Sequence, residues 1–175
     1  MSRSLHDRLA KVRLLFLDND GVLTDGRIVL GDYGDELKFF DVQDGFGLAL
    51  ARRFGIRSVI VSGKKCRVNP RRAKELGIER LFQGVTDKLD VFEKITRRWR
   101  IQPEEVCCIG DDWLDLAPMR RAGVAVAVAN AVPEVRSAAQ WVTTRPGGRG
   151  AVREVVDAVL KARGLYAEAL RQYDR

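Results

Sequence analysis

The chain lacks the segments that mark secreted and membrane proteins. Its N-terminal stretch, MSRSLHDRLAKVR, is charged throughout and has no apolar core of the kind that a signal peptide needs. No apolar run approaches the length of a membrane span. We therefore expect a cytoplasmic protein that has no membrane partner.

Cysteine and histidine are scarce. The 175 residues include three cysteines and one histidine, His6. Cys107 and Cys108 are adjacent in an apolar run, and neighbours in a strand point to opposite faces, so they are poor disulfide partners. We interpret these two and Cys66 as reduced interior residues. His6 lies in a segment that we expect to be disordered, and we assign it no role.

Acidic residues are in the minority. Lysine and arginine number 31 against 24 acidic residues, which gives a formal net charge of +7. This excess favours acidic partners, whether nucleic acid, a membrane surface or a phosphorylated metabolite. The basic residues form short clusters such as Lys64-Lys65, and the chain shows no basic stripe with aromatics and no recognition helix. We therefore expect no nucleic-acid partner, and interpret most of the charge as a solvated surface.

The hydrophobic pattern alternates between strand-like runs and helical spacing. Apolar runs predict strands at 12–17, 58–61, 106–109 and 124–128. Helical spacing predicts helices at 46–54, 71–76, 89–99, 114–121 and 151–163. This alternation indicates an α/β fold, a Rossmann-like three-layer sandwich with helices on both faces of a parallel sheet.

One domain with an inserted hairpin accounts for the whole length. A chain of 175 residues can build one sizeable core and is too short for two ordinary domains. The segment GRIVLGDYGDELKFF holds two alternating runs, 27–30 and 36–40, joined by a Gly/Asp turn, which predicts a hairpin at about 27–40. We expect a charged and loose C-terminal tail at about 164–175. Gly55, Gly77 and Gly123 each follow a predicted helix, where a left-handed residue is expected.

Polar and acidic residues follow the predicted strands, in FLDNDGVLTDG, VIVSGKK and CCIGDDWLD, and open a predicted helix in TDKLD. In chain order they are Asp18, Asp20, Ser62, Gly63, Lys88, Asp111, Asp112 and Asp115. Carboxylates at the edge of a core are costly unless something pairs with them. Because ligands of open α/β sheets bind at the carboxyl ends of the strands, we expect these residues to converge there.

Phosphoryl transfer through a covalent intermediate needs such a set. A carboxylate that attacks phosphorus is an anion approaching an anion, so a hard cation held by carboxylate oxygens and a lysine must neutralise the repulsion. A hydroxyl and backbone N–H groups can hold the other phosphoryl oxygens. A second carboxyl can protonate the leaving oxygen and later activate water.

Four segments, DNDGVLTDG, VSG, DK and GDDWLD, resemble in order and spacing the four motifs of the haloacid dehalogenase superfamily of phosphohydrolases. The resemblance covers roughly residues 14–156. DGVLTDG, the hairpin leading into KFFDVQDGFG, and GGRGAVREV resemble more narrowly the 3-deoxy-D-manno-octulosonate 8-phosphate phosphatases, which lack a cap domain. The resemblance implies a magnesium-dependent homotetrameric phosphatase of lipopolysaccharide biosynthesis, acting on a small phosphorylated acidic sugar.

The resemblance also implies the catalytic roles. Asp18 is expected to be the nucleophile that forms an aspartyl-phosphate, and Asp20 the general acid/base. Ser62, Gly63 and Lys88 are expected to hold the phosphoryl group together with Asp20, and Lys88 also to restrain Asp18. Taken alone, Lys88 could equally be a surface residue of a helix.

The same resemblance implies a magnesium site. Its ligands are expected to be the carboxylates of Asp18 and Asp111 and the backbone carbonyl of Asp20. Asp112 and Asp115 either support this site or favour the start of a helix.

Several positions leave the identity of the substrate sugar undetermined. Lys64 and Gln43 stand where the resembled family often has arginine, and both can touch the substrate. Arg149, in PGGRG, is a candidate anion contact. Lys64, with Lys65 and Arg67, can bind a substrate carboxylate or form a solvated basic face.

Two alternative functions remain. One is a phosphatase for a nine-carbon ulosonate 9-phosphate, or for a broader range of phosphomonoesters. The other is a catalytically silent binding domain, which the intact set of Asp18, Asp20, Lys88 and Asp111 disfavours.

The hairpin predicts assembly of several subunits. Its apolar residues are Ile28, Leu30, Tyr33, Leu37, Phe39 and Phe40. This is more apolar surface than a free two-stranded ribbon can bury. We expect hairpins of neighbouring subunits to pack together and to enclose each active site, most simply in a homotetramer.

Overall fold

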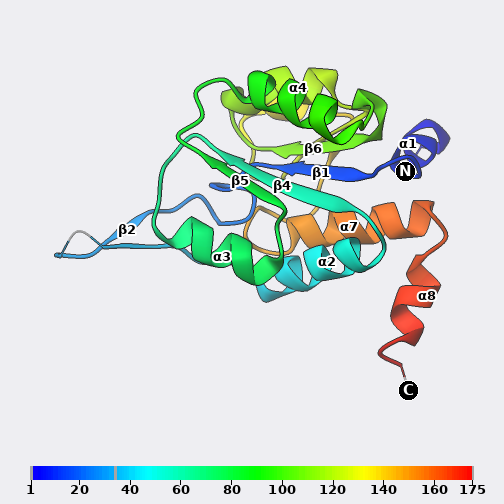
Figure 1. The fold of residues 1–175 in the computed structure, drawn as a ribbon, viewed down its shortest axis with the longest axis horizontal. Helices are drawn as coiled ribbons and strands as arrows, with labels where there is room; N and C mark the ends of the chain where they lie inside the picture. Colours follow the sequence, from blue (N-terminus) through cyan, green and yellow to red (C-terminus); the bar gives the residue numbers. More distant parts are fainter. Residues whose placement is uncertain (1, 34, 175) are drawn as a thin grey trace.

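The computed structural model describes residues 2–33 and 35–174, and within them six parallel strands form one sheet in the order β5-β4-β1-β6-β7-β8. The strands are β1 (Leu14–Leu17), β4 (Arg57–Ser62), β5 (Arg80–Gln83), β6 (Val106–Gly110), β7 (Val124–Ala127) and β8 (Trp141–Val142). The chain starts at the middle of the sheet, adds β4 and β5 on one side, and then β6, β7 and β8 on the other (Figure 1). The carboxyl ends of β4 and β6 therefore lie on either side of the end of β1.

Helices cover both faces of this sheet. They are α1 (Arg3–Leu9), α2 (Val42–Arg53), α3 (Val68–Leu76), α4 (Lys88–Trp99), α5 (Leu116–Arg121), α6 (Pro133–Ala138), α7 (Ala151–Ala162) and α8 (Tyr166–Arg171), with short 3-10 turns η1 (Pro103–Glu105) and η2 (Trp113–Asp115). α2 and α7 pack together on one face with α3 beside them, and α4 lies on the other face (Figure 1). The predicted α/β three-layer architecture is confirmed.

The central strands are buried on both faces. Every residue of β1, β6 and β7 is buried, as expected for parallel strands covered by helices, which read as continuous apolar runs. Phe16 of β1 meets Phe92 of α4 edge to face, with ring centroids 5.5 Å apart. Cys107 and Cys108 are unpaired and buried within β6, and burial raises the pKa of Cys107 to about 12. The interpretation of the cysteines as reduced interior residues is confirmed.

The predicted disorder of the N-terminus is wrong. Ser2 accepts a hydrogen bond from the backbone N–H of Leu5 at its side-chain oxygen, and α1 follows directly. Leu5 and Leu9 are buried one turn apart, so this helix contributes to the core despite its charged sequence. His6 points away from the core and is exposed.

The predicted loose tail is also wrong. The tail folds as α8, in which Ala169 is buried, and Tyr173 contacts the ring of Phe46 edge to face at 5.2 Å. Arg53 donates hydrogen bonds to the side chains of Gln172 and Tyr173. The tail is therefore packed against α2.

Two of the three predicted left-handed glycines are confirmed. Gly55 and Gly77 have φ of +75° and +67°. Gly123 does not have a positive φ; it is needed because a Cβ there would lie 2.2 Å from the backbone oxygen of Glu104. The constraint at Gly123 is a close approach of two backbone segments.

The predicted hairpin is present as β2 (Val29–Leu30) and β3 (Glu36–Leu37), paired antiparallel. The backbone N–H of Gly31 donates to the oxygen of Asp35 at 2.9 Å, and Gly34 of the predicted turn lies outside the described residues. The hairpin projects from the body of the molecule (Figure 1). At its base, Thr24 pairs with Phe40 in an isolated antiparallel bridge.

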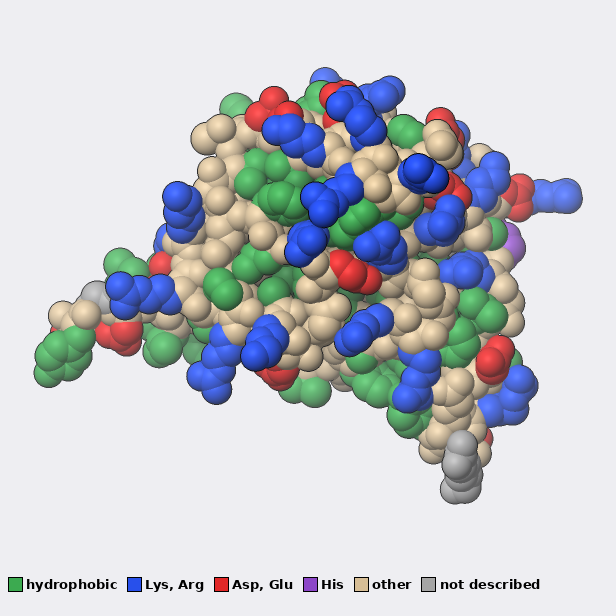
Figure 2. All heavy atoms as spheres, viewed as in Figure 1, with side chains coloured by type: hydrophobic (Ala, Val, Ile, Leu, Met, Phe, Trp, Pro, Cys, Tyr) green, Lys and Arg blue, Asp and Glu red, His purple; other side chains and the backbone are tan. Residues whose placement is uncertain are grey.

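Surface charge is dispersed on the face shown in Figure 2. Lysine and arginine side chains there stand between acidic, apolar and other polar groups. In the described part of the chain, none of the helices has the length and apolarity required to cross a membrane.

Candidate active site

The carboxyl ends of three neighbouring strands bring the predicted residues together. Asp18 follows β1, Ser62 ends β4 and Asp111 follows β6. Lys88, the first residue of α4, places its Nζ 2.7 Å from Asp18 Oδ1. Ser62 Oγ donates to Asp20 Oδ2 at 3.1 Å. Four separate stretches of sequence thus meet at one edge of the sheet.

Lys88 is buried, which excludes its alternative interpretation as a surface residue. Its Nζ donates to Asp18 Oδ1 and to Asp115 Oδ1, both at 2.7 Å. Burial alone lowers the pKa of Lys88, but the charges and hydrogen bonds of the two carboxylates outweigh it and raise the pKa above its ordinary value. The ammonium group is therefore a fixed positive charge beside Asp18.

Asp115, whose role the sequence left open, holds this arrangement in place. Its Oδ1 accepts from Lys88, and its Oδ2 accepts from the backbone N–H of Asp111 at 3.1 Å. Both carboxylate oxygens are therefore engaged in orienting neighbours. Asp112 caps the turn η2, accepting from the backbone N–H of Trp113 at 2.7 Å, so the helix-start interpretation holds for Asp112.

The carboxylates of Asp18, Asp111 and Asp115 form a cluster that fits a divalent cation. One oxygen from each lies within 4.8 Å of the others, and Lys88 pairs with Asp18 and Asp115, so three ionised carboxylates would carry two more charges than its ammonium neutralises. Among the described residues Asp111 Oδ1 is buried without a hydrogen-bond partner. This free oxygen and the excess negative charge suit a hard cation such as magnesium, which binds through oxygen ligands.

Burial and, after it, mutual repulsion raise the pKa values of Asp18 and Asp111. Burial, with the charges of Asp18 and Asp115, raises the pKa of Asp111 to about 8. Burial, with the charge of Asp115, raises the pKa of Asp18 to about 6, against the opposing effect of Lys88. A cation bound here would relieve this repulsion and keep both carboxylates ionised.

Gly21 allows the loop after β1 to approach Asp111. Its φ is +98°, and a Cβ on this residue would lie 2.0 Å from Asp111 Oδ2. Any side chain at position 21 would therefore occupy the place of the carboxylate.

Asp20 accepts hydrogen bonds on both carboxylate oxygens. Ser62 Oγ donates to Oδ2, and Asn19 Nδ2 donates to Oδ1 at 3.1 Å. The ammonium of Lys38, in the hairpin segment, also contacts Oδ1. The Asp20 side chain is 28% exposed, so it faces the open side of the site.

Sequence reasoning missed Lys38. The available signal was the alternation of the second hairpin strand, which places Glu36, Lys38 and Phe40 on one face and Leu37 and Phe39 on the other. In the structure the first set faces inward and the second is exposed.

The family model described as haloacid dehalogenase-like hydrolase matches residues 54–154. Over 172 residues the chain is 42% identical to the 3-deoxy-D-manno-octulosonate 8-phosphate phosphatase of Escherichia coli, covering 98% of this chain and 92% of that protein. The chain belongs to the haloacid dehalogenase-like hydrolases.

Two solved structures of such hydrolases share its fold. The 3-deoxy-D-manno-octulosonate 8-phosphate phosphatase of Yersinia pestis superimposes with a TM-score of 0.94 at 41% identity, covering 95% of this chain and 90% of that one. The corresponding enzyme of Moraxella catarrhalis gives a TM-score of 0.96 at 36% identity and covers 99% of both chains. The Moraxella structure holds a magnesium ion, a phosphate ion and a KDO molecule.

The remaining predicted residues of this hydrolase lie around the central cluster. Lys64 Nζ lies 2.8 Å from Glu36 Oε2 of the hairpin. Gln43 Oε1 accepts from Arg145 Nη1 at 2.6 Å. Arg149 is exposed in the segment before α7. The structure therefore brings Lys64 to the hairpin, whereas the Gln43 side chain is paired with Arg145.

The backbone at Gly63 and at Gly148 borders the open side of the site. Gly63 is exposed after β4, and a Cβ there would lie 3.1 Å from Leu114 Cδ1. Gly148 N–H donates to the oxygen of Val22 at 2.9 Å, which fixes the segment carrying Arg149 against the loop after β1.

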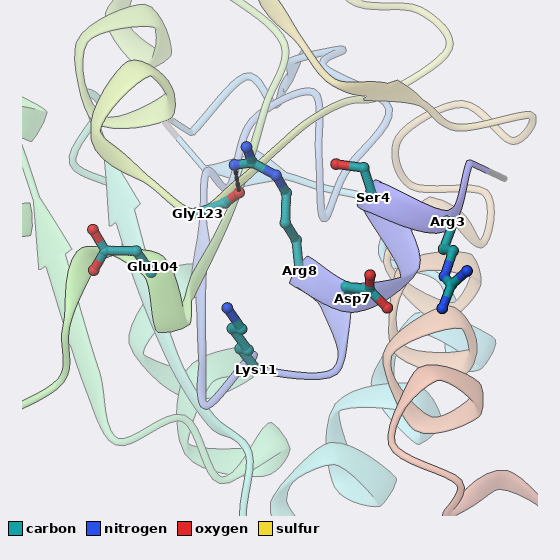
Figure 3. Close-up of a pocket in the computed structure, with 7 residues that line it drawn as sticks. All are labelled: Arg3, Ser4, Asp7, Arg8, Lys11, Glu104 and Gly123. Carbon is teal, nitrogen blue, oxygen red and sulfur yellow. Dashed lines mark hydrogen bonds between the residues drawn. The ribbon is translucent and has the colours of Figure 1, made fainter.

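Two hollows flank different parts of the hydrolase. One, of about 630 Å³, lies between the hairpin and the start of α3, and Lys65, Arg67 and Arg71 are among its lining residues. The other, of about 510 Å³, is drawn in Figure 3 and lies where β1, β6 and β7 begin. There Arg8 Nη1 donates to the oxygen of Gly123 at 3.0 Å (Figure 3). This second hollow lies at the opposite edge of the sheet from the carboxylates.

Proposed function

We propose that this protein is a magnesium-dependent phosphatase that hydrolyses 3-deoxy-D-manno-octulosonate 8-phosphate through an aspartyl-phosphate intermediate. The buried pair of Lys88 and Asp18, beside the cluster with Asp111, carries the proposal. It combines a carboxylate nucleophile, a fixed cation and oxygen ligands for a metal in one place. The 42% identity to the E. coli enzyme of this name supports the substrate.

The first half of the reaction phosphorylates Asp18. One carboxylate oxygen of Asp18 attacks phosphorus, and the bond from phosphorus to the sugar oxygen breaks as the new bond forms. Asp20, in its protonated form, gives its proton to the departing sugar oxygen. Lys88 and the hydroxyl of Ser62, with the backbone of Gly63, hold the phosphoryl oxygens.

The second half releases phosphate. Asp20, now a carboxylate, accepts a proton from a water molecule, which attacks phosphorus and frees Asp18 and inorganic phosphate. The carboxylates of Asp18 and Asp111 and the backbone carbonyl of Asp20 would hold magnesium, which would supply positive charge to offset that of the phosphoryl group.

The basic rim supports an acidic sugar as substrate. Lys64 follows the phosphate-binding segment directly, and the exposed Arg149 lies in the segment fixed against the loop after β1. Lys65 and Arg67 line the neighbouring hollow. We assign Lys64 and Arg149 to substrate contacts, with the sugar carboxylate directed toward this basic region.

We infer that residues 1–175 form a single hydrolase domain without a cap, and that it acts as a homotetramer in the cytoplasm in lipopolysaccharide biosynthesis. The hairpin returns to the loop after β1 through the bridge of Thr24 and Phe40, so it does not form a separate unit. Its outer face exposes Leu37 and Phe39, at 55% and 61%. Neighbouring subunits would cover this surface and exclude water from the site.

Phosphate release across a panel of sugar phosphates tests the proposal. With magnesium present, we expect the highest kcat/KM for the eight-carbon 8-phosphate. Equal or higher values for a nine-carbon 9-phosphate, or similar values across unrelated phosphomonoesters, would contradict the assigned substrate. No release from any member would contradict the phosphatase itself.

A further inference from the structure

A chain of ion pairs joins the hairpin to Asp20. The ammonium of Lys38 contacts Asp20 Oδ1 and lies 3.5 Å from Glu36 Oε1. The other oxygen of Glu36 lies 2.8 Å from Lys64 Nζ. Alternating charges therefore link the hairpin to the loop that carries Asp20.

The second hairpin strand buries a charged side chain and exposes large apolar ones, which is the reverse of the usual arrangement. The Lys38 side chain is 0% exposed, whereas Leu37 and Phe39 are exposed on the opposite face. Lysine is almost never fully buried unless it is paired, because removing its charge from water is costly. A strand that buries its lysine and exposes its large apolar residues places that lysine for contact with a specific group, here Asp20.

The backbone that carries Lys38 is held in register with the catalytic loop. Phe40, two residues further on and on the same face, pairs with Thr24. Thr24 Oγ1 accepts from the backbone N–H groups of Gly21 and Gly26, at 3.3 and 3.2 Å. Thr24 thus connects the base of the hairpin to the loop that carries Asp20, and these contacts also fix the backbone position of Lys38.

We propose that Lys38 is a positioning residue for the reaction proposed above: it fixes the direction of the Asp20 carboxyl from the hairpin side. This inference rests on the proposed function. Lys38 and Asn19 hold Oδ1 while Ser62 holds Oδ2, so rotation of the carboxyl breaks contacts on both oxygens. Glu36, itself paired with Lys64, lies 3.5 Å from the same ammonium and adds a second negative charge beside it. The orientation of the Asp20 carboxyl therefore depends on the position of the hairpin.

Kinetics of Lys38→Met test this role. Methionine keeps the length and apolar stem but cannot contact the carboxylate as an ammonium does. We expect kcat for the eight-carbon sugar phosphate to fall about 10- to 100-fold, as misplaced catalytic groups typically cause, with KM changed by less than about threefold. Lys94→Met is the matched control, because Lys94 is an exposed lysine of α4 that pairs with Asp90 of the same helix. Its kcat should equal that of the wild type.

A double-mutant comparison separates positioning from a general structural effect. In an Asp20→Asn background Lys38→Met should change the rate by less than about twofold, because the group that it positions is already disabled. Single-turnover assays with enzyme in excess keep these slow rates measurable. The inference is wrong if Lys38→Met leaves kcat unchanged, raises only KM, or costs as much in the Asp20→Asn background as in the wild type. A wild-type protein that releases no phosphate contradicts the proposed function itself, and this inference with it.

Discussion

Lys88 Nζ and Asp18 Oδ1 form a buried ion pair, 2.7 Å long, at the point where β1 ends. Such a pair would be a doubtful source of stability, because desolvation of both charges offsets their attraction. Its value is chemical: Lys88 keeps one oxygen of Asp18 fixed, while the second remains available to attack or to bind a metal. Asp115 keeps Lys88 in place from the other side.

Asp18→Asn should abolish turnover and preserve the fold. The amide keeps the shape of the side chain but cannot attack phosphorus, and Lys88 retains its contact with Asp115. Phosphate release and far-UV circular dichroism measure the two expectations. Near-normal activity that persists through further purification would contradict the covalent mechanism.

Asp20→Asn should slow catalysis by about 10²–10⁴-fold, the usual contribution of general acid/base catalysis. Both halves of the reaction depend on this carboxyl, so neither phosphorylation of Asp18 nor release of phosphate should keep its normal rate. Rapid-quench measurement of the two steps checks this. A variant that loses only substrate affinity would contradict the assigned role.

Removal of magnesium with EDTA should abolish activity, and added magnesium should restore it. Asp111→Ala should raise the magnesium concentration needed for half-maximal activity sharply, because it removes the oxygen that is buried without a partner. Full activity of the wild type after exhaustive chelation would contradict the metal site. Asp112→Ala is the control, since Asp112 caps the turn η2 and is not part of the carboxylate cluster.

The sequence allowed the centre of the sheet and the carboxylate edge to be predicted, for a physical reason. β1, β6 and β7 are buried on both faces, so their apolar runs are unambiguous, and parallel strands necessarily bring their polar ends together. β5 and β8 were missed because they are the edge strands: β5 begins with the exposed Arg80, and β8 has two residues, both half-buried. Their short, mixed composition resembles that of a loop.

Charged helices and ion pairs between distant segments were harder to predict. The sequences of α1 and α8 predict disordered ends because charges dominate them, although a few apolar residues such as Leu5 and Ala169 reach the core. The contact of Lys38 with Asp20 depends on the direction in which the hairpin folds back. Sequence alternation assigns Lys38 a face but does not say which face meets the catalytic loop.

Asp44 should make stability depend on pH. This buried carboxyl accepts from the backbone N–H groups of Gly150 and Arg153 and so caps α7 from α2. Burial raises its pKa to about 6 from an ordinary 3.8. Since the folded-state pKa is raised, the stabilisation is complete below pH 3.8 and is lost as the pH rises through about 6.

Asp44→Asn measures this effect. The free energy of unfolding of the variant, minus that of the wild type, should rise by on the order of 3 kcal/mol as the pH goes from 4 to 7. Urea unfolding at several pH values gives the difference between the two proteins at each pH. A constant difference across this range would show that Asp44 does not titrate as expected.

Polar substitutions on the outer face of the hairpin should break the proposed tetramer. Leu37 and Phe39 are exposed and lie beside the inward Lys38 on the same segment, so Leu37→Ser with Phe39→Ser removes apolar surface while keeping the charged face intact. Light scattering at micromolar concentration should show a tetramer for the wild type and smaller species for the variant. Activity toward sugar phosphates should fall with the loss of neighbouring subunits, because bulk water then enters the site.

Leu170→Ser provides a matched control for this experiment. Leu170 of α8 is 56% exposed, close to the 55% of Leu37, but it lies on the C-terminal helix and not on the hairpin. If exposed apolar area in general drove association, both variants would dissociate alike. If the hairpin is the interface, only its variant should change in size. A wild-type protein that is a monodisperse and fully active monomer would contradict the shared enclosure and leave the chemistry of Asp18 unaffected, since every side chain assigned to that chemistry comes from one chain.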